Sequence, residues 1–173
     1  PLKKKPLQFS SLSHLSLASF CRLKNKPGFR DCDWDHNNVD VDIDLGFGVW
    51  LKKERIRLYA IDTPESRTRD KVEKLFGKAS KKHLKKLLES AESISLISHD
   101  KGKFGRILGE IYIHNDDAEL NVNQKMIDDC HAVPYTGENK DLVEQQHMDN
   151  RKVVMETGYV TQEEIDKVSW WFI

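Results

Sequence analysis

Residues able to hold a cation or a proton gather at the end of the segment RLYAIDTPES, residues 57–66. Pro64 restricts Thr63 to an extended conformation, so the chain is expected to turn sharply after an apolar strand. Such a turn would place the Asp62 carboxylate, the Thr63 carbonyl oxygen and the Glu65 carboxylate around one small volume. A hard cation such as calcium prefers oxygen ligands of these kinds. The corner therefore predicts a cation site.

Two arginines could bring positive charge to the same place. Arg57 lies on the strand itself, and Arg106 ends the distant turn KFGR. Guanidinium groups bind phosphate oxygens through paired hydrogen bonds, so these two residues predict a phosphate ligand. On a continuous strand, side chains alternate between two faces. One face is then expected to carry Arg57, Tyr59 and Ile61, and the other Leu58, Ala60 and Asp62.

Hydrophobic periodicity indicates the elements that must position these residues. Apolar residues alternate with aspartates from Val39 to Leu45, which is typical of a half-buried strand. Residues 77–91 change to helical spacing, with a row of lysines opposite the apolar face. That apolar face is Ala79, Leu84, Leu87, Leu88 and Ala91. Further strands are expected at 55–61, 94–98 and 106–113, and further helices from Asn121 to Cys130, over 140–157 ending at Gly158, and from Thr161.

This order of elements predicts an α+β domain, with a small closed β-barrel and helices packed outside it. A length of 173 residues favours a single domain with its own core. We expect a basic tail at 1–30, the barrel domain at 31–160 and a C-terminal helical extension at 161–173. The three cysteines fit neither a disulfide framework nor a zinc site, and Cys130 is expected to be an idle turn residue.

Charge is segregated along the chain although its formal net value is zero. Residues 31–44 carry six aspartates and no base, whereas residues 67–86 carry nine lysines or arginines against two acids. An acidic block beside a basic one suits a site that holds a cation and attracts a polyanion. Solvated faces are the alternative for each block. No apolar run approaches the roughly 20 residues that a membrane span requires, so no membrane partner is expected.

The N-terminal segment carries seven basic residues and no acid within residues 1–30, and it is rich in serine. It loosely imitates a targeting peptide, although serines and His14 interrupt its apolar stretch. A disordered or wrongly translated extension is the interpretation that we favour. The segment leaves both an intracellular and an exported location open.

Four blocks in unbroken order resemble the staphylococcal nuclease family, and in particular its phage-type members. They are RIRLYAIDTPES, EKLFGKASKKHLKKLL, DKGKFGRILGEIYI and LNVNQKMIDDCHAVPY, and the likeness covers roughly residues 39–157. The resemblance implies an OB-fold barrel of five strands with three helices. It also implies a monomeric endonuclease, a hydrolase that cleaves phosphodiester bonds of DNA or RNA with Ca²⁺ as cofactor.

The resemblance implies a role for each matching residue. Arg57 and Arg106 would bind the scissile phosphate, and Glu65 would act as general base toward the attacking water. Asp62 and the backbone oxygen of Thr63 would bind calcium. The residues matching the nucleotide pocket are Lys103, Phe104 and Tyr135, where a base could stack.

The chain departs from the family where a second aspartate should bind calcium. The family has a DGDT segment there, whereas this chain reads CDWDHNNVDVDID. Without a gap, the ligand position is Asn37; with two inserted residues it is Asp35, the ligand that we favour, with Trp34 in place of a glycine. The strand that should open the barrel is also expected to be missing, because KNKPGFRDCD has little β character.

Three alternative readings remain open at this stage. Asp31, Asp33, Asp35 and Asp42 imitate an EF-hand loop, although His36 replaces its glycine. Arg57 and Glu65 could form a purely structural ion pair. The chain could also be a nucleic-acid-binding module that keeps the barrel surface but has lost catalysis with its altered metal loop.

Overall fold

The computed structural model describes residues 22–23, 37–102, 105–116, 118–137 and 139–170. Three residues with expected roles, Asp35, Lys103 and Phe104, lie outside this part of the chain. The strands are β1 (Arg22–Leu23), β2 (Asn38–Asp44), β3 (Trp50–Leu58), β4 (Ile61–Asp62), β5 (Ser93–Lys101), β6 (Ile107–Asn115), β7 (Ala118–Asn121) and β8 (Val133–Pro134). The helices are α1 (Lys71–Glu89), α2 (Val122–Asp128), α3 (Lys140–Glu156) and α4 (Gln162–Ser169). The predicted α+β class is confirmed.

Pairing between strands runs in a closed circuit, as a small barrel of the OB type requires. Antiparallel pairs join β3 to β2, β2 to β1, β1 to β5 and β5 to β6, and a parallel pair joins β6 back to β3. Gly109 of β6 pairs with Leu58 on one side and Ser98 on the other. A Cβ atom at Gly109 would lie 2.6 Å from Leu96 Cδ1, so glycine allows the strands to approach there.

The first strand corrects one expectation. β1 pairs Leu23 with Ile43 of β2 and with Ile94 of β5, so a strand does occupy the opening position of the barrel. It is two residues long. Backbone hydrogen bonds need no particular side chains, and so short a strand leaves no periodic pattern in the sequence. β7 escaped prediction as well, and it extends the sheet beyond β6.

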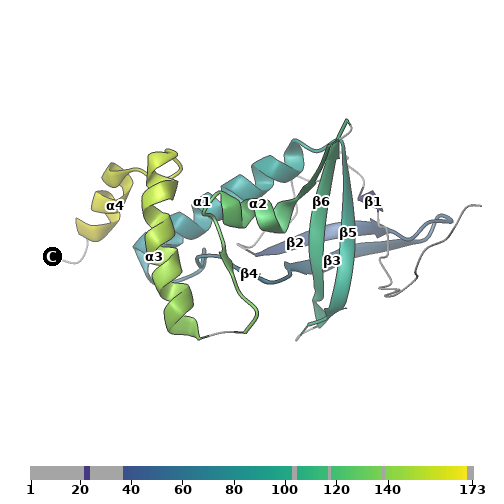
Figure 1. Cartoon of the computed structure of the whole chain (residues 1–173), viewed down its shortest axis with the longest axis horizontal. Helices are drawn as coiled ribbons and strands as arrows, with labels where there is room; N and C mark the ends of the chain where they lie inside the picture. The colour runs from purple at the N-terminus through teal and green to yellow at the C-terminus, as the bar shows by residue number, and fades with distance from the viewer. Residues whose placement is uncertain (1–21, 24–36, 103–104, 117, 138, 171–173) are drawn as a thin grey trace, which may run out of the picture.

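The hydrophobic core lies between the sheet and two helices, α1 and α2 (Figure 1). The alternating residues Val39, Val41 and Ile43 are buried as predicted, whereas Leu45 is 45% exposed at the start of the β2–β3 turn. Fully burying one such side chain stabilises a fold by about 1.5–3 kcal/mol. The helix row predicted from spacing is buried too, apart from the partly buried Leu87.

Capping residues set the limits of the helices. α1 begins at Lys71 and not at residue 77, because the Asp70 side chain accepts hydrogen bonds from the backbone N–H groups of Val72 and Glu73. α2 ends before Cys130, whose φ of 61° is incompatible with a helix. α3 and α4 follow the predicted limits, and Thr161 forms its capping box with Glu164. The described residues form four helices where the family resemblance implied three.

The strand that carries Arg57 is broken, contrary to the expected alternation. β3 ends at Leu58 and β4 begins at Ile61, with Ala60 between them at a φ of 58°. A left-handed residue reverses the local chain direction and resets which face the next side chain takes. Arg57 and Asp62 therefore line the same pocket, although strict alternation would have separated them.

Candidate active site

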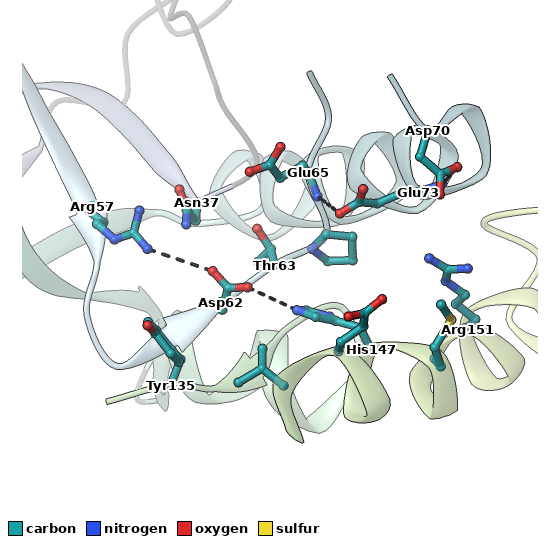
Figure 2. A pocket seen from close by; sticks show the side chains of 14 residues that line it. Asn37, Arg57, Asp62, Thr63, Glu65, Asp70, Glu73, Tyr135, His147 and Arg151 are labelled. Atoms are coloured by element: carbon teal, nitrogen blue, oxygen red, sulfur yellow. Dashed lines mark hydrogen bonds and ion pairs between the residues drawn. The ribbon is translucent and has the colours of Figure 1, made fainter. Parts of the chain in front are cut away.

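A pocket of about 550 Å³ opens where β3 and β4 meet the beginning of α1 and one face of α3 (Figure 2). Four of the residues predicted to act in catalysis or cation binding line it, together with Tyr135 of the predicted nucleotide pocket. The lining residues are Asn37, Arg57, Asp62, Thr63, Pro64, Glu65, Asp70, Glu73, Tyr135, Val143, Glu144, His147, Met148 and Arg151.

Asp62 lies between an arginine of the sheet and a histidine of a helix (Figure 2). Its Oδ1 atom is 3.9 Å from Arg57 Nη2, and its Oδ2 atom is 3.2 Å from His147 Nε2. Since a carboxylate only accepts hydrogen bonds, His147 Nε2 carries the hydrogen. One end of the Asn37 side-chain amide lies 3.2 Å from Arg57 Nη1 and 3.3 Å from Nη2, and its other end lies 2.8 Å from Asn38 Nδ2.

Helix α1 determines where Glu65 lies. The backbone N–H of Glu65 donates to Glu73 Oε1 at 3.3 Å. A Cβ atom at Gly77 would lie only 2.6 Å from the Glu65 carbonyl carbon and from the Ser66 nitrogen. Any larger residue at this position would therefore push the turn that carries Glu65 away from the helix. The glycine that weakens α1 intrinsically is the residue that allows this close approach.

Thr63 and Tyr135 both line the pocket, from two chain segments that pair with each other. Thr63 is 1% exposed, and its Oγ1 atom has no hydrogen-bond partner among the described residues. The backbone N–H of Tyr135 donates to the Ala60 carbonyl oxygen at 2.9 Å, next to the pairing of Asp62 with Val133. The β4–β8 pair therefore brings a chain segment more than seventy residues away in sequence against the turn.

Arg106 is not among the lining residues, and it directly precedes β6, which pairs with the strand of Arg57. Its Nη1 atom lies 3.4 Å from Asn38 Oδ1, and Asn38 pairs with Arg57 across β2 and β3. The next residue, Ile107, pairs with Ile56. Arg57 lies on β3 and Arg106 directly precedes β6, and the neighbouring residues Asn37 and Asn38 contact the two guanidinium groups.

The oxygen atoms of this corner suit a hard cation in type, but the carboxylates are few. Asp62 and the unsatisfied hydroxyl of buried Thr63 are present, and Asn37, the ligand position expected if the sequence is matched without a gap, also lines the pocket. Within the described ranges, no group of three or more His, Cys, Asp or Glu residues is placed to hold a metal ion. The favoured ligand Asp35 lies outside those ranges.

Two alternative readings from the sequence are overturned by these contacts. Asp42, the last ligand of the supposed EF-hand loop, lies in the middle of β2, where its Oδ2 atom is 2.7 Å from Lys52 Nζ. Residues 38–42 belong to an extended strand that pairs with β3, so this backbone cannot wrap around a cation as the end of an EF-hand loop does. Among the described residues, the ion pair of Arg57 is with Asp62 and not with Glu65.

Sequence reasoning missed the contribution of α3. Val143, His147 and Arg151 line the pocket at intervals of four residues, so they share one helix face. This spacing was visible in the predicted helix, but only the fold shows which face meets β4. Gly77 was equally visible, as a glycine within a predicted helix. The structure explains why glycine is needed there, because the turn with Glu65 and Ser66 packs directly against it.

A second histidine site lies away from the pocket, between α1 and the segment after α2. His83 Nε2 donates to Asp129 Oδ2 at 2.8 Å, and Tyr159 Oη donates to His83 Nδ1 at 2.9 Å. His131 stacks on His83 with ring centroids 4.2 Å apart. Burial lowers the pKa of His131 to about 4, and the nearby charge of His83 acts in the same direction.

The chain matches one known protein family over most of the segment that forms the pocket. Residues 55–158, more than half of the chain, match the family described as "Staphylococcal nuclease homologue". The chain belongs to this family. None of the helices formed by the described residues has the length and apolar character needed to cross a bilayer.

Two curated relatives from rice (Oryza sativa subsp. japonica) are similar to part of the chain. "Probable staphylococcal-like nuclease CAN2" is 33% identical over 84 residues, which is 49% of this chain and 20% of the relative. "Probable staphylococcal-like nuclease CAN3" is 32% identical over 84 residues, 49% of this chain and 19% of the relative. The chain thus spans about a fifth of each relative's length. Both are plant proteins, so they lend no support to the particular likeness to phage-type members.

Proposed function

We propose that this chain hydrolyses phosphodiester bonds of DNA or RNA with calcium as cofactor and acts as an endonuclease. The observation that carries the proposal is the placement of Arg57, Asp62 and Glu65 around one pocket. Family membership supports the same activity. The names of the two rice relatives agree with it, although they describe much longer proteins.

The arginines are assigned to stabilise the negative charge that develops during hydrolysis. Phosphodiester hydrolysis passes through a five-coordinate arrangement with additional negative charge, which fixed cations stabilise more than they stabilise the ground state. Arg57 lines the pocket, and Arg106 directly precedes β6 and contacts Asn38. We assign both guanidinium groups to the phosphate oxygens.

Glu65 is assigned as the general base that takes a proton from the attacking water. General-base help accelerates such a step by about 10² to 10⁴. The contacts with Glu73 and Gly77 fix the backbone from which this carboxylate projects. Tyr135 is assigned to the wall that receives a base, together with Lys103 and Phe104.

The residues that would hold calcium are Asp62, the Thr63 carbonyl oxygen and Asp35. Bound there, a divalent cation would neutralise phosphate charge and orient the water. His147 holds Oδ2 of Asp62, which leaves Oδ1 on the side of Arg57, 3.9 Å from Nη2. We therefore assign to His147 the positioning of this ligand.

Digestion of single-stranded DNA and RNA, each with calcium and with chelator, tests the proposal. Native protein is expected to cut with calcium only, and Arg57→Gln is expected to lose about 10² to 10³ in rate. Arg55→Gln is the matched control, because Arg55 lies on the same strand but pairs with Asp40 at 2.7 Å outside the pocket. Calcium should also raise the unfolding temperature of the native protein. Cleavage that is unchanged in Arg57→Gln would refute this site.

A second candidate is a binding module without catalysis. The observation in its favour is Asn37, a neutral residue in contact with Arg57 at the wall where the family has a calcium-binding aspartate. Binding of single-stranded nucleic acid that ignores chelator, with no cleavage, would support this candidate over the enzyme.

A further inference from the structure

Arg151 brings a third arginine to the pocket, from α3. It lines the cavity with His147 one turn before it, on the same face of the helix. Figure 2 shows Arg57 and Arg151 on opposite sides of the Asp62 and His147 pair. A group bound by Arg151 would therefore be distinct from a phosphate held at Arg57.

The charge of Arg151 is not neutralised within the described part of the chain. Its guanidinium carbon lies 5.1 Å from the centre of the Phe76 ring, and its buried Nε atom has no hydrogen-bond partner there. No described carboxylate lies within ion-pair distance, although Asp70 and Glu73 line the same pocket. Both acids are engaged elsewhere, Asp70 as the cap of α1 and Glu73 with the Glu65 N–H.

Such a guanidinium is ready to accept an anion. The guanidinium itself lies over the Phe76 ring, so little side-chain freedom is lost on binding. Its planar fork matches the oxygens of a phosphate, to which it can donate two hydrogen bonds. The anion available in a site that receives nucleic acid is a neighbouring phosphate of the same strand.

We propose that Arg151 binds a second, non-scissile phosphate of the nucleic-acid strand, so that α3 forms a phosphate subsite next to the cleavage site. This inference rests on the proposed function and deepens it. It predicts a preference for strands with at least one phosphate beyond the scissile one. A structural role, in which Arg151 only packs against Phe76, predicts no such preference.

Three forms of one dinucleotide separate these roles: one without a terminal phosphate, one with a 5′-phosphate and one with a 3′-phosphate. Native protein should cleave one phosphorylated form about 10-fold to 100-fold more efficiently than the plain form, as charge-assisted hydrogen bonds allow. Arg151→Met keeps the apolar stem and removes the charge. It should lose this gain while its kcat/KM on the plain form stays at the native value.

Lys152→Met is the matched control, since it removes the same charge from an exposed neighbour on the same helix. It should keep the gain. A native protein that treats all three forms alike overturns the subsite, and so does an Arg151→Met variant that loses equally on all three. The affinities of the three dinucleotide forms, measured with chelator so that none is cleaved, should show the same ratios. If nothing is cleaved, the proposed nuclease fails, and the binding ratios alone decide the subsite.

Discussion

Two aspartate–histidine pairs lie in this molecule in opposite surroundings. In the pocket, His147 contacts Asp62 at 3.2 Å, and the second carboxylate oxygen faces Arg57 across 3.9 Å. Between the helices, His83 contacts Asp129 at 2.8 Å, and the second oxygen is bound by Lys125 Nζ at 2.6 Å. The first carboxylate has an oxygen within reach of a ligand, whereas the second is fully engaged.

This difference shows that an aspartate–histidine contact alone does not distinguish a binding site from a structural network. Burial opposes ionisation of Asp129, but hydrogen bonds from Lys125 and His83 outweigh it and keep the pKa of Asp129 below its usual range. Burial also lowers the pKa of His83, although the bond to Asp129 acts in the opposite direction. A network satisfied in this way stabilises the junction of α1 with the segment after α2. The pocket pair retains unused capacity for binding.

Removing each carboxylate should separate the two roles most strongly. Asp62→Asn is expected to lower kcat/KM at least about a hundredfold, because a proposed cation ligand loses its charge while its shape is kept. Asp129→Asn should leave kcat/KM unchanged and lower the free energy of unfolding by about 1–3 kcal/mol. Nuclease assays and urea unfolding of both variants check this. Native activity in Asp62→Asn together with a large loss of activity in Asp129→Asn would contradict this assignment of the two pairs.

The histidine cluster between the helices should make the stability of the fold sensitive to acid, through His131. The pKa of His131 is about 4 in the folded chain against 6.5 for an unperturbed histidine, so the unfolded chain binds protons more readily. Stability is therefore complete above about pH 6.5 and is lost progressively as the pH falls toward 4, by about 3 kcal/mol in all. Unfolding measured from pH 7 to pH 4 reports this loss. His131→Phe keeps the stacked ring and should flatten the pH dependence; an unchanged slope would exclude His131 as its source.

Gly77→Ala should disturb the pocket and spare the helical junction. Alanine normally stabilises a helix relative to glycine by about 1 kcal/mol, but here its Cβ would meet the backbone of Glu65 and Ser66 at 2.6 Å. The turn would have to move to relieve this contact, and a misplacement of about 1 Å in a catalytic group can lower the rate about a hundredfold. Lys78→Ala, on the exposed face of the same turn, is the control. Equal kcat values for the two variants would mean that the turn does not hold Glu65.

Much of this fold could be predicted, because period-2 and helical patterns are local. The buried faces of β2 and α1 follow directly from Val39, Val41, Leu84 and Leu88. The capping signals of Thr161 and Gly158 also set real limits. The two-residue strand β1 could not be found this way, because it depends on partners far along the chain.

The site was predictable only in part, for physical reasons that differ between residues. Asp62 and Glu65 stand out by their positions after a strand and around a proline. Their common pocket with Arg57 depends on the left-handed conformation of Ala60, a residue type with no preference for it. His147 and Arg151 are separated from Asp62 by more than eighty residues, so only the packing of α3 reveals them.

The value of kcat/KM for Glu65→Gln on single-stranded DNA, with calcium present, tests the central claim most directly. The amide keeps the size of the carboxylate and cannot accept the proton. We expect a loss of about 10² to 10⁴, with oligonucleotide binding and unfolding temperature at native values. Glu156→Gln, on the exposed end of α3, should remain fully active. Native kcat/KM in Glu65→Gln would contradict the assignment of this pocket as the catalytic site.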